Sequence, residues 1–432
     1  MRSIAKKLVA LACAGGLTLG MTACTGGSGT SNEGGGEKNA AAGEVEGDIT
    51  LQTWSLKNDK FTPYFEKLVK DFEKENPKVK VKWMDQPGDG YEDKLLQQAN
   101  ADELPDVVNI PPEFGLPLAK AGKLMDLKGA ENNDLDKYVK GGVEAYQYPG
   151  VEGSYGYPWY LGVSFNYWNK DLLKKAGIDK APANEEEFLA DAQKAAEKGV
   201  AMVSQAPSIG TLSARGVKVW DPDARKFTFN SEDGVKIVEE YAKLYQAGAI
   251  PAELITAVDK GNIGNEAFYK ETLAGIQSTP SFADDVVTNA PSLEGKVEVT
   301  EPWETPQLLV QGVAVAKNSK HPAAALALAK YLTNNENQVA FVKIAKGFMP
   351  GTQEGNKDAA SLRDGSETDL MKQALDVSGK TVQRAELLTP VEMSDEMKTA
   401  VLQEIALALQ GNKTPKEALD SAVQKCNAMI EQ

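Results

Sequence analysis

Side chains that commonly catalyse reactions are scarce in this sequence. The only histidine, His321, stands beside Pro322 at an expected helix start, where a solvated imidazole is the simplest interpretation. A Ser-His-Asp triad would have to use this one residue, and the chain has neither a G-x-S-x-G turn nor a phosphate-binding loop. Zinc sites need clusters of histidine or cysteine, so the sequence predicts no metal centre and no cofactor.

Carboxylates, in contrast, are abundant, with 62 Asp and Glu against 47 Lys and Arg. A glycosidase needs only two carboxylates, and the sequence does not show which pairs meet in space, so this class of enzyme stays an open alternative. The formal net charge of −15, without a basic patch interleaved with aromatic residues, argues against nucleic acid as a partner. Cys426 has no histidine partner on its expected helix, which favours a small packed side chain over a nucleophile.

The first residues have the layout of an export signal. Basic residues at positions 2, 6 and 7 precede a short apolar run over 8–19, which is typical of a secretory signal peptide. The run ends on Met-Thr-Ala-Cys, which resembles a bacterial lipobox, although Met stands where Leu is more common. The resemblance implies a signal peptide over 1–23, cleavage before Cys24 and lipidation of that cysteine. Cleavage elsewhere, with an incidental Cys24, is the alternative.

The segment that follows Cys24 predicts a tether. Residues 25–47 include eight glycines and no large apolar side chain beyond Val45. Such a composition cannot bury enough surface to order itself, so we expect a lipidated cysteine and flexible linker over 24–47.

Expected strands and helices alternate from residue 48 onward. Residues 49–54 alternate between apolar and polar types, as a half-buried strand does, and apolar residues at helical spacing follow. The pattern repeats, which gives expected strands at 49–54, 79–83, 106–110, 275–278 and 310–316, and helices at 61–72, 91–101, 185–198, 231–247, 322–333, 394–410 and 415–430. This alternation predicts an α/β fold with a mainly parallel sheet, in which ligands bind beyond the carboxyl ends of the strands.

A family resemblance begins at residues 155–177, which read YGYPWYLGVSFNYWNKDLLKKAG. The piece Tyr-x-Asn-Lys-Asp-Leu-Leu-x-x-Ala-Gly, which starts at Tyr167, closely resembles the signature of extracellular sugar-binding proteins of ABC transporters, the group that includes maltose-binding protein. Three further stretches agree with it in order, namely LPDVV at 104–108, FTFNSEDGVKIVEEYAKLYQAGAIP at 227–251 and GVAVAKNSKHPAAALALAKYL at 312–332. The resemblance therefore covers nearly all of residues 48–432.

The resemblance implies a two-lobed α/β fold of the periplasmic-binding-protein type (class II), with a ligand cleft between the lobes. On this sequence the first lobe would comprise residues 48–159 and 312–352, and the second lobe residues 160–311 and 353–432. Only a ligand that touches both lobes stabilises their closed arrangement, so hinge closure would accompany binding.

The shape of a pyranose indicates which residues such a cleft needs. Its faces carry C–H bonds and its rim carries hydroxyls, so a site requires flat aromatic surfaces together with carboxylates or amides. We expect Trp54 at a strand end, Trp159 at the lobe crossing and Trp303 in the proline-flanked loop EPWETP to supply the aromatic surfaces. Each of them could instead pack in the core.

Further ligand-binding residues are implied by position in the family. Asn58 and Asp59 follow the first expected strand, where the family places polar ligands, and Glu113 lies in the loop after the third, where it places an acidic one. Gln86 is a weaker candidate, and Phe282 follows the strand at 275–278 one position later than the aromatic residue of related proteins. Solvated loop residues are the alternative for the polar members.

The sequence thus predicts a monomeric, lipid-anchored substrate-binding protein of an ABC importer on the extracellular face of a Gram-positive membrane. It would capture a carbohydrate, most simply an oligosaccharide, and deliver it to the permease subunits without breaking a bond. A receptor of the same fold for a peptide, a polyol or a metal is the first alternative, and a lipid-anchored glycosidase is the second.

Overall fold

Two β-sheets organise the molecule. The computed structural model describes residues 43–130, 132–256, 262–357, 359–363 and 365–430, all within one compact unit, Asn39–Gln432. The larger sheet consists, in spatial order, of β11 (Met349–Pro350), β4 (Tyr157–Val163), β10 (Leu308–Val315), β3 (Val107–Ile110), β1 (Gly47–Trp54) and β2 (Val79–Gln86). The smaller sheet has the order β8 (Gly275–Ser278), β5 (Phe165–Asn169) and β9 (Val297–Thr300). The expected signal peptide and Cys24 lie outside the described residues.

One half of the larger sheet is built from βαβ units. β1 pairs in parallel with β2 and β3, and the helices α1 (Thr62–Glu75) and α2 (Tyr91–Asn100) connect these strands. α1 buries Phe65, Leu68 and Phe72 along one stripe. The helix ends before Pro77, because the proline ring disfavours helical backbone in the residue that precedes it. The elements expected over residues 48–110 are thereby confirmed.

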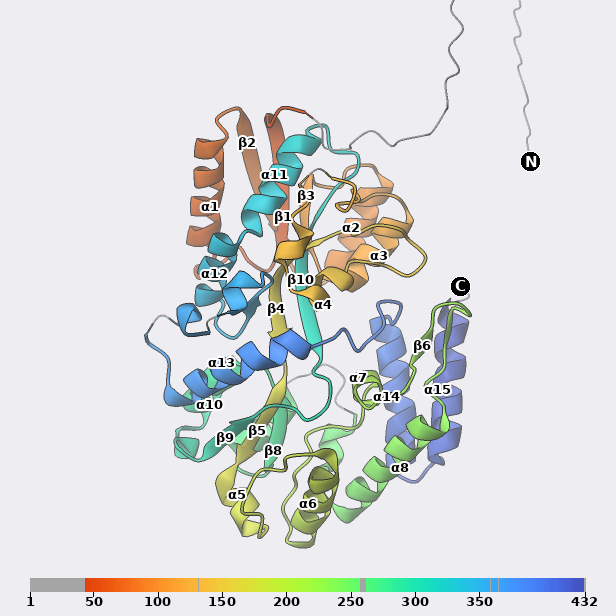
Figure 1. Ribbon diagram of the computed structural model, residues 1–432. Helices are drawn as coiled ribbons and strands as arrows, with labels where there is room; N and C mark the ends of the chain where they lie inside the picture. Colours follow the sequence, from red (N-terminus) through yellow and green to blue (C-terminus); the bar gives the residue numbers. More distant parts are fainter. Residues whose placement is uncertain (1–42, 131, 257–261, 358, 364, 431–432) are drawn as a thin grey trace, which may run out of the picture. The chain divides into compact units, whose positions relative to one another are not determined.

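The other half of the larger sheet is antiparallel. β10 pairs antiparallel with both β3 and β4, and β4 pairs antiparallel with β11. The expectation of a mainly parallel sheet is therefore wrong for these strands. The physical reason is the path of the chain. It reaches β10 from β9 of the smaller sheet, so β10 enters the larger sheet from the end opposite to the one at which β3 starts (Figure 1).

The smaller sheet is antiparallel throughout. β5 lies at its centre and pairs with β8 on one side and β9 on the other. Only Ser164 separates β4 from β5, so the chain passes directly from one sheet to the other. Because residues 159 and 160 both lie within β4, and residues 311 and 312 both lie within β10, the lobe boundaries expected from the sequence fall inside strands of the larger sheet.

Helices cover both sheets and form a separate layer near the carboxyl end of the chain. Those after β3 are α3 (Pro112–Lys120), α4 (Lys140–Glu144), α5 (Lys170–Lys175), α6 (Glu185–Glu197), α7 (Ile209–Ala214), α8 (Glu232–Ala247), α9 (Asn262–Tyr269), α10 (Phe282–Asn289), α11 (Pro322–Leu332), α12 (Asn335–Ile344), α13 (Asp369–Thr381), α14 (Asp395–Leu409) and α15 (Pro415–Ile430). α14 packs against α15 and α8 (Figure 1). Among the described residues, no helix combines the length and apolar character needed to cross a membrane.

Local signals place several of these helices as expected. Ser231 caps the start of α8 by accepting a hydrogen bond from the Gly234 backbone, and Gly248 ends the helix in the left-handed region, with φ of 88°. Proline stands in the first turn of α11, where its missing N–H costs no helical hydrogen bond. His321 occupies the preceding position, and its imidazole lies over Gly47, where an added Cβ would meet the ring at 2.2 Å.

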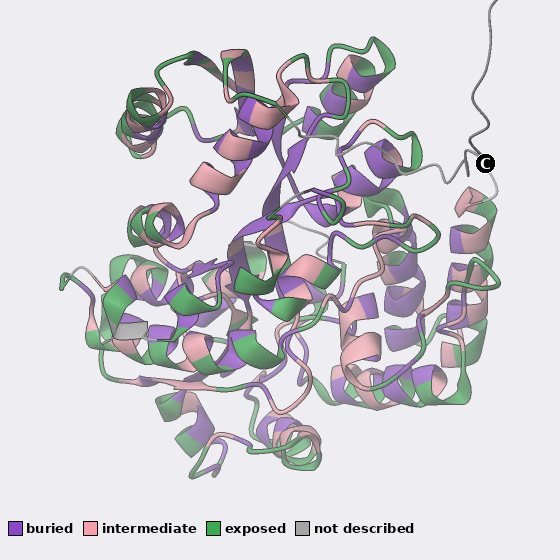
Figure 2. Ribbon diagram, turned by 45° about the horizontal axis from the view of Figure 1, so that its top comes forward, coloured by how far each residue is buried: buried purple, intermediate pink, exposed green. Residues whose placement is uncertain are grey.

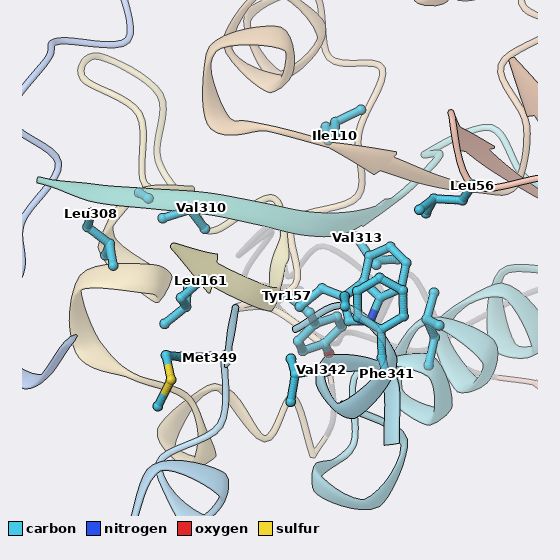
Figure 3. Packing of buried hydrophobic residues seen from close by; sticks show 14 of the residues in the cluster. Leu56, Ile110, Tyr157, Leu161, Leu308, Val310, Val313, Phe341, Val342 and Met349 are labelled. Carbon is cyan, nitrogen blue, oxygen red and sulfur yellow. The ribbon is translucent and has the colours of Figure 1, made fainter. Parts of the chain in front are cut away.

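Two hydrophobic cores stabilise the described residues. The first holds the larger sheet, one face of the smaller sheet and helices such as α12, whose Phe341 and Val342 point toward the strands (Figure 3). The second joins the other face of the smaller sheet to α6, α8, α14 and α15, and it buries Cys426 completely. Figure 2 shows the central strands as mostly buried.

Candidate functional site

A cavity of about 740 Å³ lies where β4 and β10 leave the larger sheet. The carboxyl ends of β1 and β4, the segment after β3 and the start of β10 supply one part of its wall. The rest comes from α7 and its approach, β8, α14, Phe348 and the segments around 304–307 and 387–393. The lining residues are Trp54, Pro111, Pro112, Glu113, Tyr160, Gly162, Ser164, Gln205, Ser208, Gly210, Thr211, Ala214, Gln277, Glu304, Thr305, Gln307, Leu308, Leu309, Val310, Gln311, Phe348, Leu387, Leu388, Thr389, Pro390, Val391, Met393 and Lys398.

Strand register explains this location. Gly312 of β10 pairs with Ile110, the last residue of β3, so the residues of β10 before Gly312 extend beyond the end of β3. They pair instead with β4, where Leu309 faces Gly162. Leu309 is 47% exposed, which makes it one of the few large apolar side chains left open. The crossing strands thus form the floor of the cavity, at the sheet edge where α/β proteins bind ligands.

Trp54 lies in the cavity wall. It is half-buried at the end of β1, and its indole stacks on Tyr91 with ring centroids 5.8 Å apart and an interplanar angle of 23°. The stacked tyrosine fixes the orientation of the indole, because aromatic pairs favour such offset geometry. Trp54 therefore presents a supported, flat surface to the cavity.

Tyr160 is the second aromatic surface, and the sequence did not single it out. It packs between Phe341, at 5.1 Å, and Phe348, at 4.9 Å, and lines the cavity together with Phe348. Its neighbour Trp159 was expected in this role. Trp159 is instead fully buried in the first core against Phe65, at 5.8 Å, and Phe341, at 4.6 Å. Adjacent residues of a strand point to opposite faces, and β4 turns Tyr160 to the cavity and Trp159 away from it.

The other two aromatic candidates also lie outside this cavity. Phe282 is 1% exposed at the start of α10 and packs against Tyr167 and Phe268, at 5.0 and 5.5 Å. Trp303 lies beside a small adjoining pocket, where its indole stacks near Trp168 at 6.4 Å. Phe282 is therefore buried among aromatic neighbours in the core, whereas Trp303 lines the small pocket that adjoins the cavity.

Three polar candidates near β1 and β2 do not line the cavity either. Asn58 is exposed, and its Oδ1 accepts hydrogen bonds from the backbone of Lys60 and Phe61, which stabilises the turn before α1. Asp59 is exposed in the same turn. Gln86 is the last residue of β2 and pairs with the end of β1 in the sheet. A ligand-binding role for these three residues stays a prediction.

Glu113 lines the cavity, but it lies in the first turn of α3 rather than in a loop. The pair Pro111-Pro112 starts this helix directly after β3, which brings the carboxylate to the sheet edge. Burial raises the pKa of Glu113, and the ammonium group of Lys398 acts against that rise. The position also suits a carboxylate electrostatically, because the amino end of a helix carries partial positive charge.

Glu304 is a second carboxylate in the cavity wall, and the sequence did not single it out. Burial raises its pKa, the nearby carboxylate of Glu185 raises it further, and Arg215 lowers it. The available signal was its place next to Trp303 in EPWETP, a loop that carries an acid on either side of the tryptophan. The two carboxylates make the cavity an acceptor of hydrogen bonds.

Amides and hydroxyls complete the polar lining. They come mainly from α7 and its approach and from the strands β8 and β10, and they are Gln205, Ser208, Thr211, Gln277, Gln307 and Gln311. Gln311 is held by the Asn109 side chain, whose Nδ2 donates to its Oε1 at 3.2 Å. No sequence pattern indicated this set, since its members come from distant segments. Together with Trp54 and Tyr160 they form a wall of flat apolar faces bordered by hydrogen-bonding groups.

The described residues offer no metal site, since no group of three or more His, Cys, Asp or Glu side chains is placed to hold an ion. The sole histidine lies at the start of α11, away from the residues that line the cavity. The side chains that line the cavity offer aromatic contact and hydrogen bonding.

Known proteins resemble this chain in sequence and fold. A family model described as bacterial extracellular solute-binding protein matches residues 58–339. A protein of Brucella abortus (strain 2308) named as a binding protein is 27% identical over 333 residues, which are 74% of this chain and 78% of that protein. The diacetylchitobiose binding protein DasA of Streptomyces coelicolor is 28% identical over 252 residues, 56% of each chain.

The fold likeness extends over most of the chain. The crystal structure of a protein from Synechococcus sp. MITs9220, described as an oligosaccharide periplasmic-binding protein, matches with a TM-score of 0.75 and 26% identity, over 88% of this chain and 99% of that one. The MalE sugar-binding protein of Xanthomonas citri matches with a TM-score of 0.74 at 20% identity, over 89% of this chain and 98% of its own. The two-lobed α/β fold expected from the sequence is confirmed.

Proposed function

This chain belongs to the bacterial extracellular solute-binding proteins, and from that premise we propose that its 740 Å³ cavity captures a carbohydrate. The observation that carries the proposal is the pairing of two supported aromatic faces, Trp54 and Tyr160, with a border of amides and carboxylates. A pyranose needs both, because its C–H faces pack on aromatic rings while its hydroxyls need hydrogen-bond partners.

The cavity dimensions support an oligosaccharide as the ligand. Small-molecule sites measure about 300–1,000 Å³, and 740 Å³ lies in the upper part of that range. The names of two similar proteins point the same way, since one is described as oligosaccharide-binding and DasA as diacetylchitobiose-binding. A neutral or basic glycan fits the lining better than an acidic one, because Glu113 and Glu304 would repel a carboxylate or sulfate.

We also propose that binding couples to hinge closure. The lobes would comprise residues 48–159 with 312–352 and residues 160–311 with 353–432, so that β4 and β10 carry the crossing segments. A ligand that contacts Trp54 and Glu113 on one side and Glu304 on the other would favour the closed arrangement, because it gains contacts only when both sides reach it.

The same proposal includes export, anchoring and delivery. Cleavage before Cys24 and its lipidation would hold a monomer on the extracellular face of a Gram-positive membrane, where it would pass its ligand to the permease of an ABC importer. Mass spectrometry of the protein purified from its membrane tests the anchor, since a diacylated amino-terminal cysteine is expected at Cys24. A Cys24→Ala variant released into the medium would support the anchor, and membrane retention of that variant would contradict it.

We propose, finally, that the ligand is released unchanged. A glycosidase would use a pair of carboxylates, and Glu113 and Glu304 are the pair that this cavity offers. Incubation with the bound glycan, followed by a reducing-sugar assay, tests the proposal. Release of reducing ends by the wild-type protein, lost in either Glu→Gln variant, would support the glycosidase instead.

The first experiment is a thermal-shift screen of the purified protein. The panel contains mono- and oligosaccharides, with polyols, amino acids, peptides and divalent metals beside them. A rise of several degrees with one glycan class is expected, because a ligand that binds only the native state stabilises it by mass action. A shift with a peptide or a metal, and with no sugar, would contradict the carbohydrate assignment.

A further inference from the structure

A small side pocket of about 60 Å³ adjoins the cavity. The two spaces share four lining residues, Gln205, Thr211, Gln277 and Glu304, so the pocket lies directly beside the place where we propose that sugar binds. The pocket offers room for about four to six water-sized groups, since one water needs about 10–15 Å³ on this scale. That is the size of a short substituent rather than of a sugar ring.

The smaller sheet forms one wall of this pocket. Side chains of a strand alternate between faces, so Asn166 and Trp168 of β5 lie on the same side. Asn166 pairs in register with Gln277 of β8, and Trp168 pairs with Gly275. A Cβ on Gly275 would lie 2.4 Å from the Trp168 ring, so the glycine lets the indole lie against the strand. All four residues line the pocket.

The pocket is apolar at one end. Trp168, Phe188 and Trp303 surround it, with ring centroids of Trp303 5.1 Å from Phe188 and 6.4 Å from Trp168. Met202 and Ile276 add aliphatic surface. A methyl group against these aromatic faces would gain apolar contacts.

The remaining lining is polar and includes an unused donor. Asn166 is 7% exposed, and its Nδ2 has no hydrogen-bond partner among the residues that the structure describes. A buried donor without a partner is costly because it has lost its hydrogen bonds to water, so a ligand that supplies an acceptor would remove this cost. Asn166 therefore points to a ligand group that accepts a hydrogen bond.

Glu304 supplies the complementary acceptor. The nearest guanidinium, Arg215, pairs with Glu185 and with Glu240, whose Oε2 lies 2.7 Å from its Nη2. These contacts engage Arg215 with other carboxylates, while Glu304 lines both the cavity and the pocket. A ligand group that donates an N–H at the boundary of the two spaces would meet the Glu304 carboxylate.

From this combination we propose that the side pocket receives the acetamido group of an N-acetylated amino sugar. Its carbonyl accepts a hydrogen bond from Asn166 Nδ2, its N–H donates to Glu304, and its methyl group packs against Trp168 and Trp303. The four heavy atoms of the group match the space available. This inference rests on the proposed function, because the sugar ring itself must occupy the adjoining cavity.

Calorimetric titration of the full chain with matched sugars tests the proposal. Each set keeps one glycan skeleton and changes only position 2, as in cellobiose, chitobiose and N,N′-diacetylchitobiose, with glucose, galactose, mannose and lactose skeletons treated likewise. An acetamido sugar is expected to bind at least about 100-fold more tightly than its hydroxyl and amino counterparts, since a site built for a polar group rejects analogues that leave its partners unpaired.

Other outcomes overturn the proposal in separable ways. Equal affinity for the hydroxyl and acetamido members, or tighter binding of the amino member, would contradict an acetamido pocket while leaving carbohydrate binding intact. Binding of unsubstituted glycans, without binding of any acetamido sugar, would also contradict an acetamido pocket. If no carbohydrate of any kind binds, the proposed function itself fails.

Asn166→Asp provides the variant test. The change keeps the size of the side chain but replaces the donor with an acceptor, so at least a 10-fold loss of affinity for the acetamido sugar is expected. Asn100→Asp, at an exposed position of α2, is the matched control and should bind as wild type. Asn166→Ala, which removes the donor without adding a charge, serves if Asn166→Asp does not fold. Unchanged affinity in the folded Asn166 variants would refute the role of this residue and the proposal with it.

Discussion

Trp159 and Trp54 offer a direct test of the site, because one tryptophan is buried in the core and the other lines the cavity. Trp159 is fully buried among Phe65, Tyr160 and Phe341, whereas Trp54 is half-buried at the cavity. Trp159→Ala is therefore expected to destabilise the fold, and Trp54→Ala is expected to weaken binding. Each variant serves as the control for the other.

The size of the stability effect follows from burial. Replacing a buried tryptophan by alanine costs about 3–5 kcal/mol, since apolar contacts are lost and a cavity remains. The unfolding entropy of the compact unit Asn39–Gln432 is about 0.8 kcal/mol/K, from about 2.1 cal/mol/K for each of its roughly 390 residues. Trp159→Ala should therefore lower the Tm by about 4–6 °C.

Trp54→Ala should behave differently. The Trp54 indole stacks on Tyr91 and lines the cavity. Trp54→Ala is therefore expected to lower the Tm by only about 1–2 °C and to weaken sugar binding 10-fold or more, which corresponds to about 1.4 kcal/mol. Thermal unfolding monitored by circular dichroism gives the Tm, and calorimetric titration with the sugar found in the screen gives the affinity. A Trp159→Ala protein that melts within 1 °C of wild type yet no longer binds sugar would refute the placement of Trp159 in the core.

Three further predictions concern ionisable groups. Burial raises the pKa of Glu404, but hydrogen bonds from Lys413 and Lys425, at 2.5 and 2.8 Å, outweigh burial and lower this pKa below the usual range. The stability that the Glu404 carboxylate contributes is therefore present at neutral pH and lost in acid. Glu404→Gln should lower the Tm at pH 7 more than at pH 3. Burial raises the pKa of Glu304, so ionising this carboxyl as the pH rises above the usual glutamate range makes folding less favourable. Glu304→Gln removes this penalty, so the Tm of the variant minus the Tm of the wild type should be larger at pH 8 than at pH 4. Burial raises the pKa of Cys426 to about 11, and this thiol should react with Ellman's reagent only after unfolding in denaturant. Rapid labelling of Cys426 in the native protein, located by peptide mass spectrometry, would contradict its burial.

The positions of several elements could be predicted from the sequence because their signals are local. Hydrophobic periodicity located β1, α1 and β2, and capping residues such as Ser231 and Gly248 fixed the ends of α8. The order of strands and helices, with the motif that begins at Tyr167, also indicated the correct fold class. Trp54 and Glu113, which line the cavity, were predicted as candidates in the same way, since they follow strands whose carboxyl ends meet at one edge.

The direction of β10 and the facing of β4 depended on tertiary structure. A strand has the same local pattern whether its neighbour runs parallel or antiparallel, so the pairing of β10 with β3 and β4 could not be read from its sequence. Likewise, alternation along β4 requires that Trp159 and Tyr160 point to opposite faces, but it does not say which face is the core. Phe341, from α12 far along the chain, decides this by packing on Trp159.

The sequence by itself therefore determined many of the elements, the family and the sheet edge at which we propose that the ligand binds. Only the tertiary structure decided which side chains meet there, because Asn166, Gln277 and Glu304 come from three separate segments and no local pattern links them. Short-range forces act between neighbours along the chain, whereas a binding pocket depends on contacts between residues far apart in sequence.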